Sequence, residues 1–163
     1  MKTLYLMRHA KSSWKDPALG DRERPLKGRG RRDAPEMGRR LAERGPLPQL
    51  ILCSPARRAR ETAEAVAAGG GFAAARLVID ERLYFRGRSG WLEAVRDLRD
   101  TVDTLLMVGH NPDFSEVVSW LGKLPGLDLP TAALARFDLD PSAYGIGPQE
   151  ARLRDLDWPR KSD

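Results

Sequence analysis

The sequence has few of the features that mark secreted, metal-binding or membrane proteins. Among its 163 residues there is one cysteine, Cys53, which excludes an intramolecular disulfide framework and a multi-cysteine metal site. No segment approaches the ~20 apolar residues of a transmembrane helix. The chain begins with a strand-like segment rather than a signal peptide. We therefore expect a soluble cytoplasmic protein, and the length fits a single domain over residues 1–163.

Histidine is scarce as well, and the two histidines occupy equivalent positions. The apolar run at residues 3–7 ends at Arg8 and His9, and the run at residues 104–108 ends at Gly109 and His110. Such runs are typical of buried parallel strands, whose C-terminal edge holds the ligands of open α/β sheets. One histidine in this position would more often be structural. Two of them, with no others in the chain, favour a shared site.

Strand-like and helix-like segments alternate along most of the chain. Strands are predicted at residues 3–7, 49–53, 76–80 and 104–108, and helices at residues 27–44, 54–68, 91–98 and 113–121. This alternation predicts an α/β three-layer sandwich, in which a mainly parallel central sheet is flanked by helices. Two further strands are predicted at residues 132–139 and 151–156, joined by a connection at residues 141–148.

Two of the predicted helices begin directly after a strand. Ser54-Pro55 and Asn111-Pro112 each combine a capping residue with a proline that is favoured in the first helical turn. Helix N-termini offer free backbone N–H groups to anions, arginine grips phosphate oxygens bidentately, and a neutral imidazole can attack phosphorus. Four side chains are therefore the predicted components of an oxyanion pocket: Arg8, His9, Arg58 and His110.

The chain is basic, with 28 lysine and arginine residues against 23 acidic residues and a net charge of +5. This balance suits an anionic substrate. A nucleic-acid partner is not expected, because the arginine-rich segment at residues 27–44 is better explained as a solvated helix face and no stacking-aromatic motif accompanies it. No membrane partner is expected, and the sequence makes no prediction of oligomeric state.

Other phosphatase chemistries fit the sequence less well. A cysteine-dependent phosphatase would need an arginine six positions after its cysteine, but the residue six positions after Cys53 is Ala59. Cys53 is better explained as a buried strand residue. Two histidines without a recognisable carboxylate cluster are too few ligands for a metal-dependent phosphatase. We therefore expect neither a metal nor another cofactor.

Three segments carry a resemblance to a known family. The sequence has LMRHA at residues 6–10, SPARRARETA at residues 54–63 and VGHNP at residues 108–112. In this order they resemble the three motifs of the histidine phosphatase superfamily, which has the phosphoglycerate mutase-like fold. RHAKSSW at residues 8–14, RPL at residues 24–26 and the small size resemble its SixA branch of phosphohistidine phosphatases. The resemblance covers nearly the whole chain.

The resemblance implies roles for the four residues of the predicted pocket. His9 would be the nucleophile that becomes phosphorylated. Arg8 and Arg58 would bind the phosphoryl group, and His110 would donate a hydrogen bond to one of its oxygens. The implied enzyme is a metal-independent phosphatase.

A long polar loop at residues 10–26 follows the first strand at the same edge of the predicted sheet. Loops of this length at the ligand edge are usually functional. Three of its polar residues are candidate substrate contacts: Lys11, Ser12 and Arg24.

The sequence departs from the family pattern at two positions. Ala10 stands where a glycine is usual, and Phe85, two residues after Leu83, stands where many relatives have a glutamate as general acid. Asp80 and Glu81 are close enough in sequence to replace that acid.

The missing acid bears on the substrate. An alkoxide leaving group benefits from protonation, whereas the imidazole of phosphohistidine, with a conjugate-acid pKa of roughly 6.5, departs with less help. This favours phosphohistidine on a signalling or phosphotransfer protein as the substrate. A small-molecule phosphomonoesterase on the same fold is the alternative, and a non-enzymatic nucleic-acid-binding protein is the least favoured one. The expected partner is therefore a phosphorylated protein or a small phosphorylated molecule.

Overall fold

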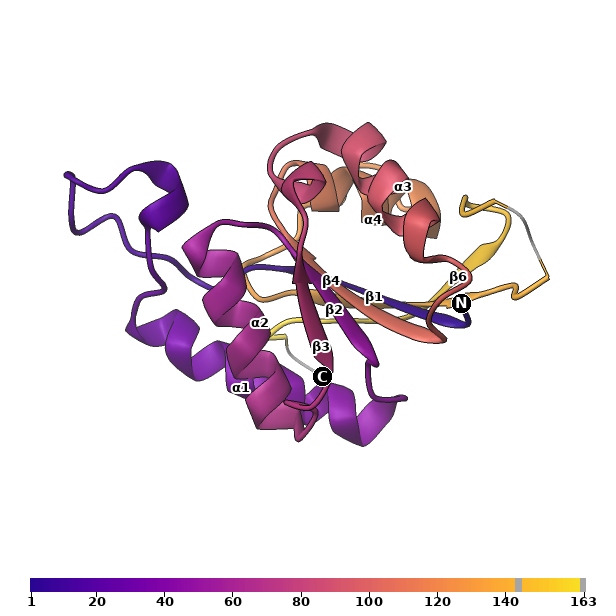
Figure 1. The fold of residues 1–163 in the computed structure, drawn as a ribbon, viewed down its shortest axis with the longest axis horizontal. Helices are drawn as coiled ribbons and strands as arrows, with labels where there is room; N and C mark the ends of the chain where they lie inside the picture. Colours follow the sequence, from indigo (N-terminus) through magenta and orange to yellow (C-terminus); the bar gives the residue numbers. More distant parts are fainter. Residues whose placement is uncertain (143–144, 162–163) are drawn as a thin grey trace.

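The computed structural model of the protein describes residues 1–142 and 145–161, and its centre is one six-stranded sheet with helices on both faces (Figure 1). The described strands are β1 (Thr3–Arg8), β2 (Leu50–Cys53), β3 (Arg76–Ile79), β4 (Thr104–Gly109), β5 (Leu134–Leu139) and β6 (Ala151–Asp157). All of the predicted strands are present. Of the predicted connection between the last two, residues 143–144 lie outside the described residues.

The strand order is β3-β2-β4-β1-β5-β6. β3, β2, β4 and β1 are mutually parallel, whereas β5 is antiparallel to β1 and β6 is antiparallel to β5. The prediction of a mainly parallel central sheet is thus confirmed. In the pairing of β1 with β4, Arg8 lies opposite Gly109, and the backbone N–H of His9 donates to the Gly109 carbonyl oxygen at 3.0 Å. This register places the two histidines next to each other at the C-terminal edge.

Two pairs of helices cover the sheet on opposite faces (Figure 1). α1 (Gly28–Arg44) and α2 (Arg57–Gly70) lie on one face, and α3 (Gly87–Leu98) and α4 (Asp113–Gly122) lie on the other. Two short 3-10 helices, η1 (Asp21–Glu23) and η2 (Glu81–Leu83), stand in the connections. The predicted three-layer α/β sandwich is confirmed.

The strands are buried on both faces because apolar residues occupy both sides of the pleat. In β1, Leu4 and Leu6 pack into the core with α3 and α4, whereas Tyr5 and Met7 pack into the core with α1 and α2. Such a strand cannot be exposed to water on either side without losing apolar burial. The sheet therefore needs both helical layers.

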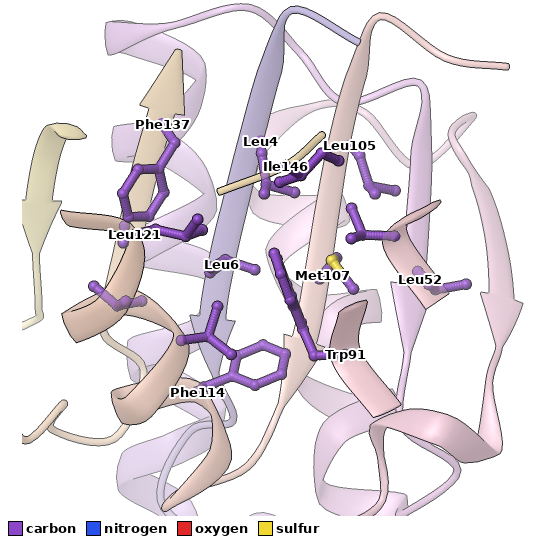
Figure 2. Close-up of a cluster of buried hydrophobic side chains, with 14 of the residues drawn as sticks. Leu4, Leu6, Leu52, Trp91, Leu105, Met107, Phe114, Leu121, Phe137 and Ile146 are labelled. Atoms are coloured by element: carbon purple, nitrogen blue, oxygen red, sulfur yellow. The ribbon is translucent and has the colours of Figure 1, made fainter. Parts of the chain in front are cut away.

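The core under α3 and α4 is built around two aromatic side chains. Figure 2 shows Trp91 from α3 and Phe114 from α4 beside Leu6 and Met107 of the sheet. Each of the four side chains is at most 1% exposed. Phe114 also lies against Gly109, where an added Cβ would come within 2.5 Å of its ring. This contact holds the end of β4 close to α4, next to His110.

The other helical layer depends on a close approach between α1 and α2. A Cβ added at Gly38 would lie 2.0 Å from the Val66 carbonyl oxygen, so the helices could not pack at this distance with any other residue there. Pro35 lies inside α1, which is a single helix from Gly28 to Arg44.

The second helix begins two residues later than predicted. α2 begins at Arg57, with Ala56 at its N-cap position, rather than with Ser54 as cap. The Ser54 hydroxyl instead accepts from the Ala56 N–H at 3.2 Å and lies 2.7 Å from Nε2 of His110. The tertiary contact with His110 outweighs the local capping preference. α4 begins at Asp113 as predicted, but its N-cap position is held by Pro112 rather than by Asn111; Oδ1 of Asn111 accepts from the Ser115 N–H, one turn further on, at 3.1 Å.

Within residues 1–142 and 145–161, no helix has both the length and the apolar character needed to cross a membrane.

Candidate active site

A pocket of about 330 Å³ opens at the C-terminal edge of β1 and β4. Its lining consists of Arg8, His9, Lys11, Ser12, Trp14, Asp21, Arg24, Arg58, Phe85, His110, Asn111 and Thr131. The structure thus brings together the four residues of the predicted oxyanion pocket and the three loop candidates. A larger hollow of about 890 Å³ along α4 contains neither histidine, so volume alone does not locate the site.

The hydrogen bond made by His9 defines its tautomer. Nδ1 of His9 lies 2.7 Å from the backbone carbonyl oxygen of Ala10. A carbonyl oxygen can only accept a hydrogen bond, so Nδ1 carries the proton and Nε2 presents its lone pair. The side chain therefore has the form required of a nitrogen nucleophile.

The surroundings of His9 also keep it neutral. Its pKa is lowered to about 3, chiefly by burial and in addition by the charges of Arg58, Arg8 and Arg24, against the opposing effect of the hydrogen bond to Ala10. Desolvation and nearby cations both disfavour the imidazolium form. The ring is consequently a neutral base throughout the physiological pH range.

His110 lies beside His9, with 5.2 Å between the ring centroids. Nδ1 of His110 lies 3.4 Å from Nη2 of Arg58, which can only donate, so Nε2 carries the proton and donates to the Ser54 hydroxyl at 2.7 Å. Burial, His9 and Arg58 lower the pKa of His110 to about 3. The ring is thus neutral and held from both sides.

Arg58 and Arg8 each place a guanidinium group at the pocket. The Arg58 side chain is only 1% exposed, and its guanidinium donates to the backbone carbonyl and the carboxylate of Asp21. The Arg8 guanidinium donates to the Leu129 carbonyl oxygen at 2.8 Å. In both arginines the buried Nε has no hydrogen-bond acceptor among the described residues. An oxyanion in the pocket would supply acceptors for such donors.

Asp21 is a pocket residue that the sequence analysis missed. Burial would raise the pKa of its carboxyl group, but hydrogen bonds from Tyr84 and Arg58 lower it to about 2. Asp21 therefore stays ionised and balances the charge of Arg58. No local pattern distinguishes it from the other acidic residues of the same loop, and only the folded loop brings it to Arg58.

Thr62, from the second of the three motifs, links His9 to α2. Its hydroxyl oxygen accepts from the Ala10 N–H at 3.0 Å and its hydroxyl group donates to the Arg58 carbonyl oxygen at 2.7 Å. Thr62 is completely buried. It thus fixes the backbone that follows His9 relative to the helix that carries Arg58.

The loop candidates lie along one wall of the pocket. Nη1 of Arg24 donates to the Ser12 hydroxyl at 3.0 Å, and the guanidinium of Arg24 lies 3.5 Å from the ring centroid of Trp14. An isolated bridge between Ser12 and Leu26 closes the loop at its base. Lys11 also lines the pocket, so this wall is positively charged.

The ring of Phe85 covers one face of the His110 imidazole. The two rings are stacked, with 4.6 Å between their centroids and an interplanar angle of 29°. Phe85 has φ = 58°, in the left-handed region that bulky side chains rarely adopt, at a cost of about 1–3 kcal/mol. Such strain is concentrated at functional sites.

The structure does not bring the two candidate acids into the pocket. Both carboxylate oxygens of Asp80 bind the Arg82 guanidinium, and Glu81 forms a bidentate ion pair with Arg22. Hydrogen bonds from these arginines lower the pKa of both carboxyl groups. Neither residue lines the pocket, and both are held in the ionised form.

Neither a metal nor a thiol centre is formed by the described residues. In the described part of the chain no group of three or more His, Cys, Asp or Glu residues is arranged to hold a metal ion. Cys53 is buried in β2, and burial raises the pKa of its thiol far above the physiological range.

The sequence and the fold both identify the family. The family model of the histidine phosphatase superfamily (branch 1) matches residues 4–86. The uncharacterized protein Rv1276c of Mycobacterium tuberculosis is 40% identical over 126 residues, which are 77% of this chain and 76% of that protein. The chain belongs to the histidine phosphatase superfamily, and is therefore a hydrolase of the phosphatase class.

Two solved structures indicate the branch. A protein of Agrobacterium tumefaciens assigned as the phosphohistidine phosphatase SixA has a TM-score of 0.79 and 29% identity, over 97% of this chain and 98% of that one. A second structure with the same assignment, from Nakamurella multipartitia, has a TM-score of 0.79 and 27% identity, over 98% and 97% of the two chains. The predicted similarity to the SixA branch is confirmed.

Proposed function

We propose that this phosphatase hydrolyses phosphohistidine on a signalling or phosphotransfer protein through a phospho-His9 intermediate. The observation that carries the proposal is the protonation state of Asp21, which has the one carboxyl group among the described residues that line the pocket. Asp21 has a pKa of about 2, because hydrogen bonds from Tyr84 and Arg58 outweigh its burial. No described carboxyl group in the pocket is therefore ready to protonate an alkoxide. A leaving group that departs without an acid suits this site.

In the first step, Nε2 of His9 attacks the phosphorus atom while the bond from phosphorus to the substrate nitrogen breaks. The second nitrogen of the substrate imidazole takes a proton from solvent, so the leaving group departs as neutral imidazole. Arg8 and Arg58 bind the phosphoryl oxygens, and their charges compensate the charge of the transferring group. No metal or other cofactor is needed for this step.

In the second step, water attacks the phosphorus atom of phospho-His9. The bond from phosphorus to Nε2 breaks, inorganic phosphate leaves, and His9 returns to its neutral form. The Nδ1–H bond to the Ala10 carbonyl keeps the ring in one orientation through both steps. Positioning and charge neutralisation supply most of the catalysis in such a reaction.

His110 has a conditional role in this mechanism. Its Nδ1 accepts from Arg58 in the free protein, so it donates to a phosphoryl oxygen only after taking up a proton. A dianionic phosphoryl group beside the ring favours the imidazolium form and raises its pKa. Substrate binding and protonation of His110 are therefore coupled.

Lys11, Ser12 and Arg24 are proposed substrate contacts, because all three line the pocket on its positively charged wall. Asp80 and Glu81 are not proposed as acids, since their arginine partners hold them outside the pocket lining.

The experiment that tests the proposal compares three substrates without added metal: a phosphohistidine-bearing protein, 3-phosphoglycerate and an alkyl phosphate monoester. We expect kcat/KM for the phosphohistidine protein to exceed the other two by at least about a hundredfold, the range that one positioned general acid contributes. Equal or faster hydrolysis of the monoester would replace the proposal with the small-molecule phosphomonoesterase.

A further inference from the structure

Two large aromatic side chains at the pocket are left open to solvent. Trp14 is 76% exposed and Phe85 is 46% exposed, and both line the pocket that contains the two histidines. Large aromatic residues normally gain stability by burial. Exposed aromatic surface at a pocket therefore indicates contact with a ligand.

The two aromatic residues differ in what already covers them. The guanidinium of Arg24 lies over the ring of Trp14, at 3.5 Å from its centroid. The ring of Phe85 is stacked on His110. The same ring also makes an edge contact with Tyr84, at an interplanar angle of 66°. Phe85 thus has one face fixed by His110 while nearly half of the residue remains open.

The backbone of Phe85 has a conformation that is unfavourable for a phenylalanine. Its φ of 58° is adopted readily by glycine and asparagine but is strained for a phenylalanine. The residue occupies that strained position without being buried in the core. A bulky residue held in an unfavourable backbone conformation without the benefit of burial is typical of a functional position.

We infer that the open part of the Phe85 ring is the contact surface for the leaving group, and that it selects planar aromatic leaving groups over flexible alcohols. A planar ring can stack on this surface in continuation of the stack formed by His110 and Phe85. An alcohol cannot stack in this way and also finds no protonated carboxyl group among the described lining residues. The inference deepens the proposed function, because the leaving group there is an imidazole.

The test uses two phosphonates that cannot be hydrolysed and that differ mainly by a ring, phenylphosphonate and methylphosphonate. Their dissociation constants are measured by calorimetry for the wild type and for Phe85→Asn, which tolerates the left-handed conformation but lacks the ring. We expect the wild type to bind phenylphosphonate roughly five- to tenfold more tightly, in line with the stacking of one aromatic pair. Phe85→Asn should lose this preference and keep its affinity for methylphosphonate within about twofold.

Three further variants act as controls. Phe85→Tyr should retain the ring preference, and Leu124→Ala, at an exposed apolar residue outside the pocket, should leave it unchanged. If Phe85→Asn weakens both phosphonates equally, Phe85 acts only through His110 and the inference is overturned. Loss of the preference in Trp14→Ala instead, or its absence in the wild type, overturns it as well.

The outcome is independent of the proposed function. Phosphonate binding does not depend on which bond the enzyme cleaves, so a ring preference can be present even if a monoester proves to be the better substrate. Conversely, the phosphohistidine protein can be the preferred substrate while the two phosphonates bind equally.

Discussion

Nδ1 of His9 lies 2.7 Å from the carbonyl oxygen of Ala10, the next residue in the chain. This contact fixes which ring nitrogen carries the proton, and it leaves Nε2 as the only nucleophilic nitrogen of the ring. The catalytic proposal follows from this relationship, since a nucleophile must be unprotonated at its point of attack.

His9 should remain in the neutral Nδ1–H form between pH 5 and 8. Burial and the charges of Arg58 and Arg8 lower its pKa to about 3, well below that pH range. Nitrogen-15 NMR of the imidazole rings measures this directly, and with only two histidines in the chain the assignment is simple. The spectrum should show Nε2 as the unprotonated nitrogen at every pH. Titration of His9 near pH 6.5 would contradict this account of its surroundings.

Acid should destabilise the protein from pH 6.5 downward. The pKa values of His9 and His110 are lowered to about 3 in the folded state. Between pH 6.5 and 3 these two histidines therefore bind protons in the unfolded state but not in the folded state. Their contribution to the free energy of unfolding is therefore fully present above pH 6.5. It is lost as the pH falls, by up to about 1.4 kcal/mol per pH unit for each histidine. Urea unfolding between pH 7 and 5 measures the loss. His110→Asn should reduce its slope, and an unchanged slope would show that this histidine titrates normally in the folded protein.

Replacing Asp21 by asparagine should strengthen oxyanion binding. Its carboxylate is ionised and lies in the pocket, so it repels an incoming anion and occupies Arg58. We expect tungstate to bind roughly three- to tenfold more tightly to Asp21→Asn in calorimetry. The free energy of unfolding should fall by about 1 kcal/mol, because the Asp21 side chain is 42% exposed and its ion pair is screened.

Glu23→Gln is the matched control, because it removes the same charge from the same short helix at a residue that does not line the pocket. It should change tungstate binding less than twofold. Weaker binding to Asp21→Asn would show that Asp21 supports the anion rather than repelling it.

Thr62→Val should impair both stability and turnover. The valine has the same shape but leaves the buried Ala10 N–H without its acceptor, at a cost of about 1–3 kcal/mol. Because Ala10 holds the ring of His9, kcat should fall by roughly tenfold or more. Urea unfolding and kcat measure the two effects, and Thr62→Ser should restore both. Lower stability with an unchanged kcat would mean that Thr62 only supports packing.

Much of the fold was predictable from the sequence because the strands are continuous apolar runs. A strand such as residues 3–7 can be buried only between two helical layers, and this requirement leads to the α/β sandwich. The boundary at Ser54 was mistaken because a local capping preference was outweighed by a contact with His110, 56 residues further along the chain. The residues next to Ser54 in the sequence do not predict such a long-range contact.

The candidate site was predictable to the extent that it depends on strand ends. Residues at the C-terminal ends of neighbouring parallel strands must lie close together, which is why His9 and His110 could be paired without a structure. Asp21 could not be found, because it reaches Arg58 through an irregular loop whose path depends on many tertiary contacts.

Trapping the phosphorylated enzyme tests whether His9 is the nucleophile. The protein is mixed with a phosphohistidine-bearing protein labelled in its phosphoryl group, quenched in alkali within the first turnover, digested and mapped. We expect a label that is stable in alkali, labile in acid and confined to His9, with no label in His9→Ala. A label on His110 or Cys53, or turnover that continues in His9→Ala, would contradict this role of His9.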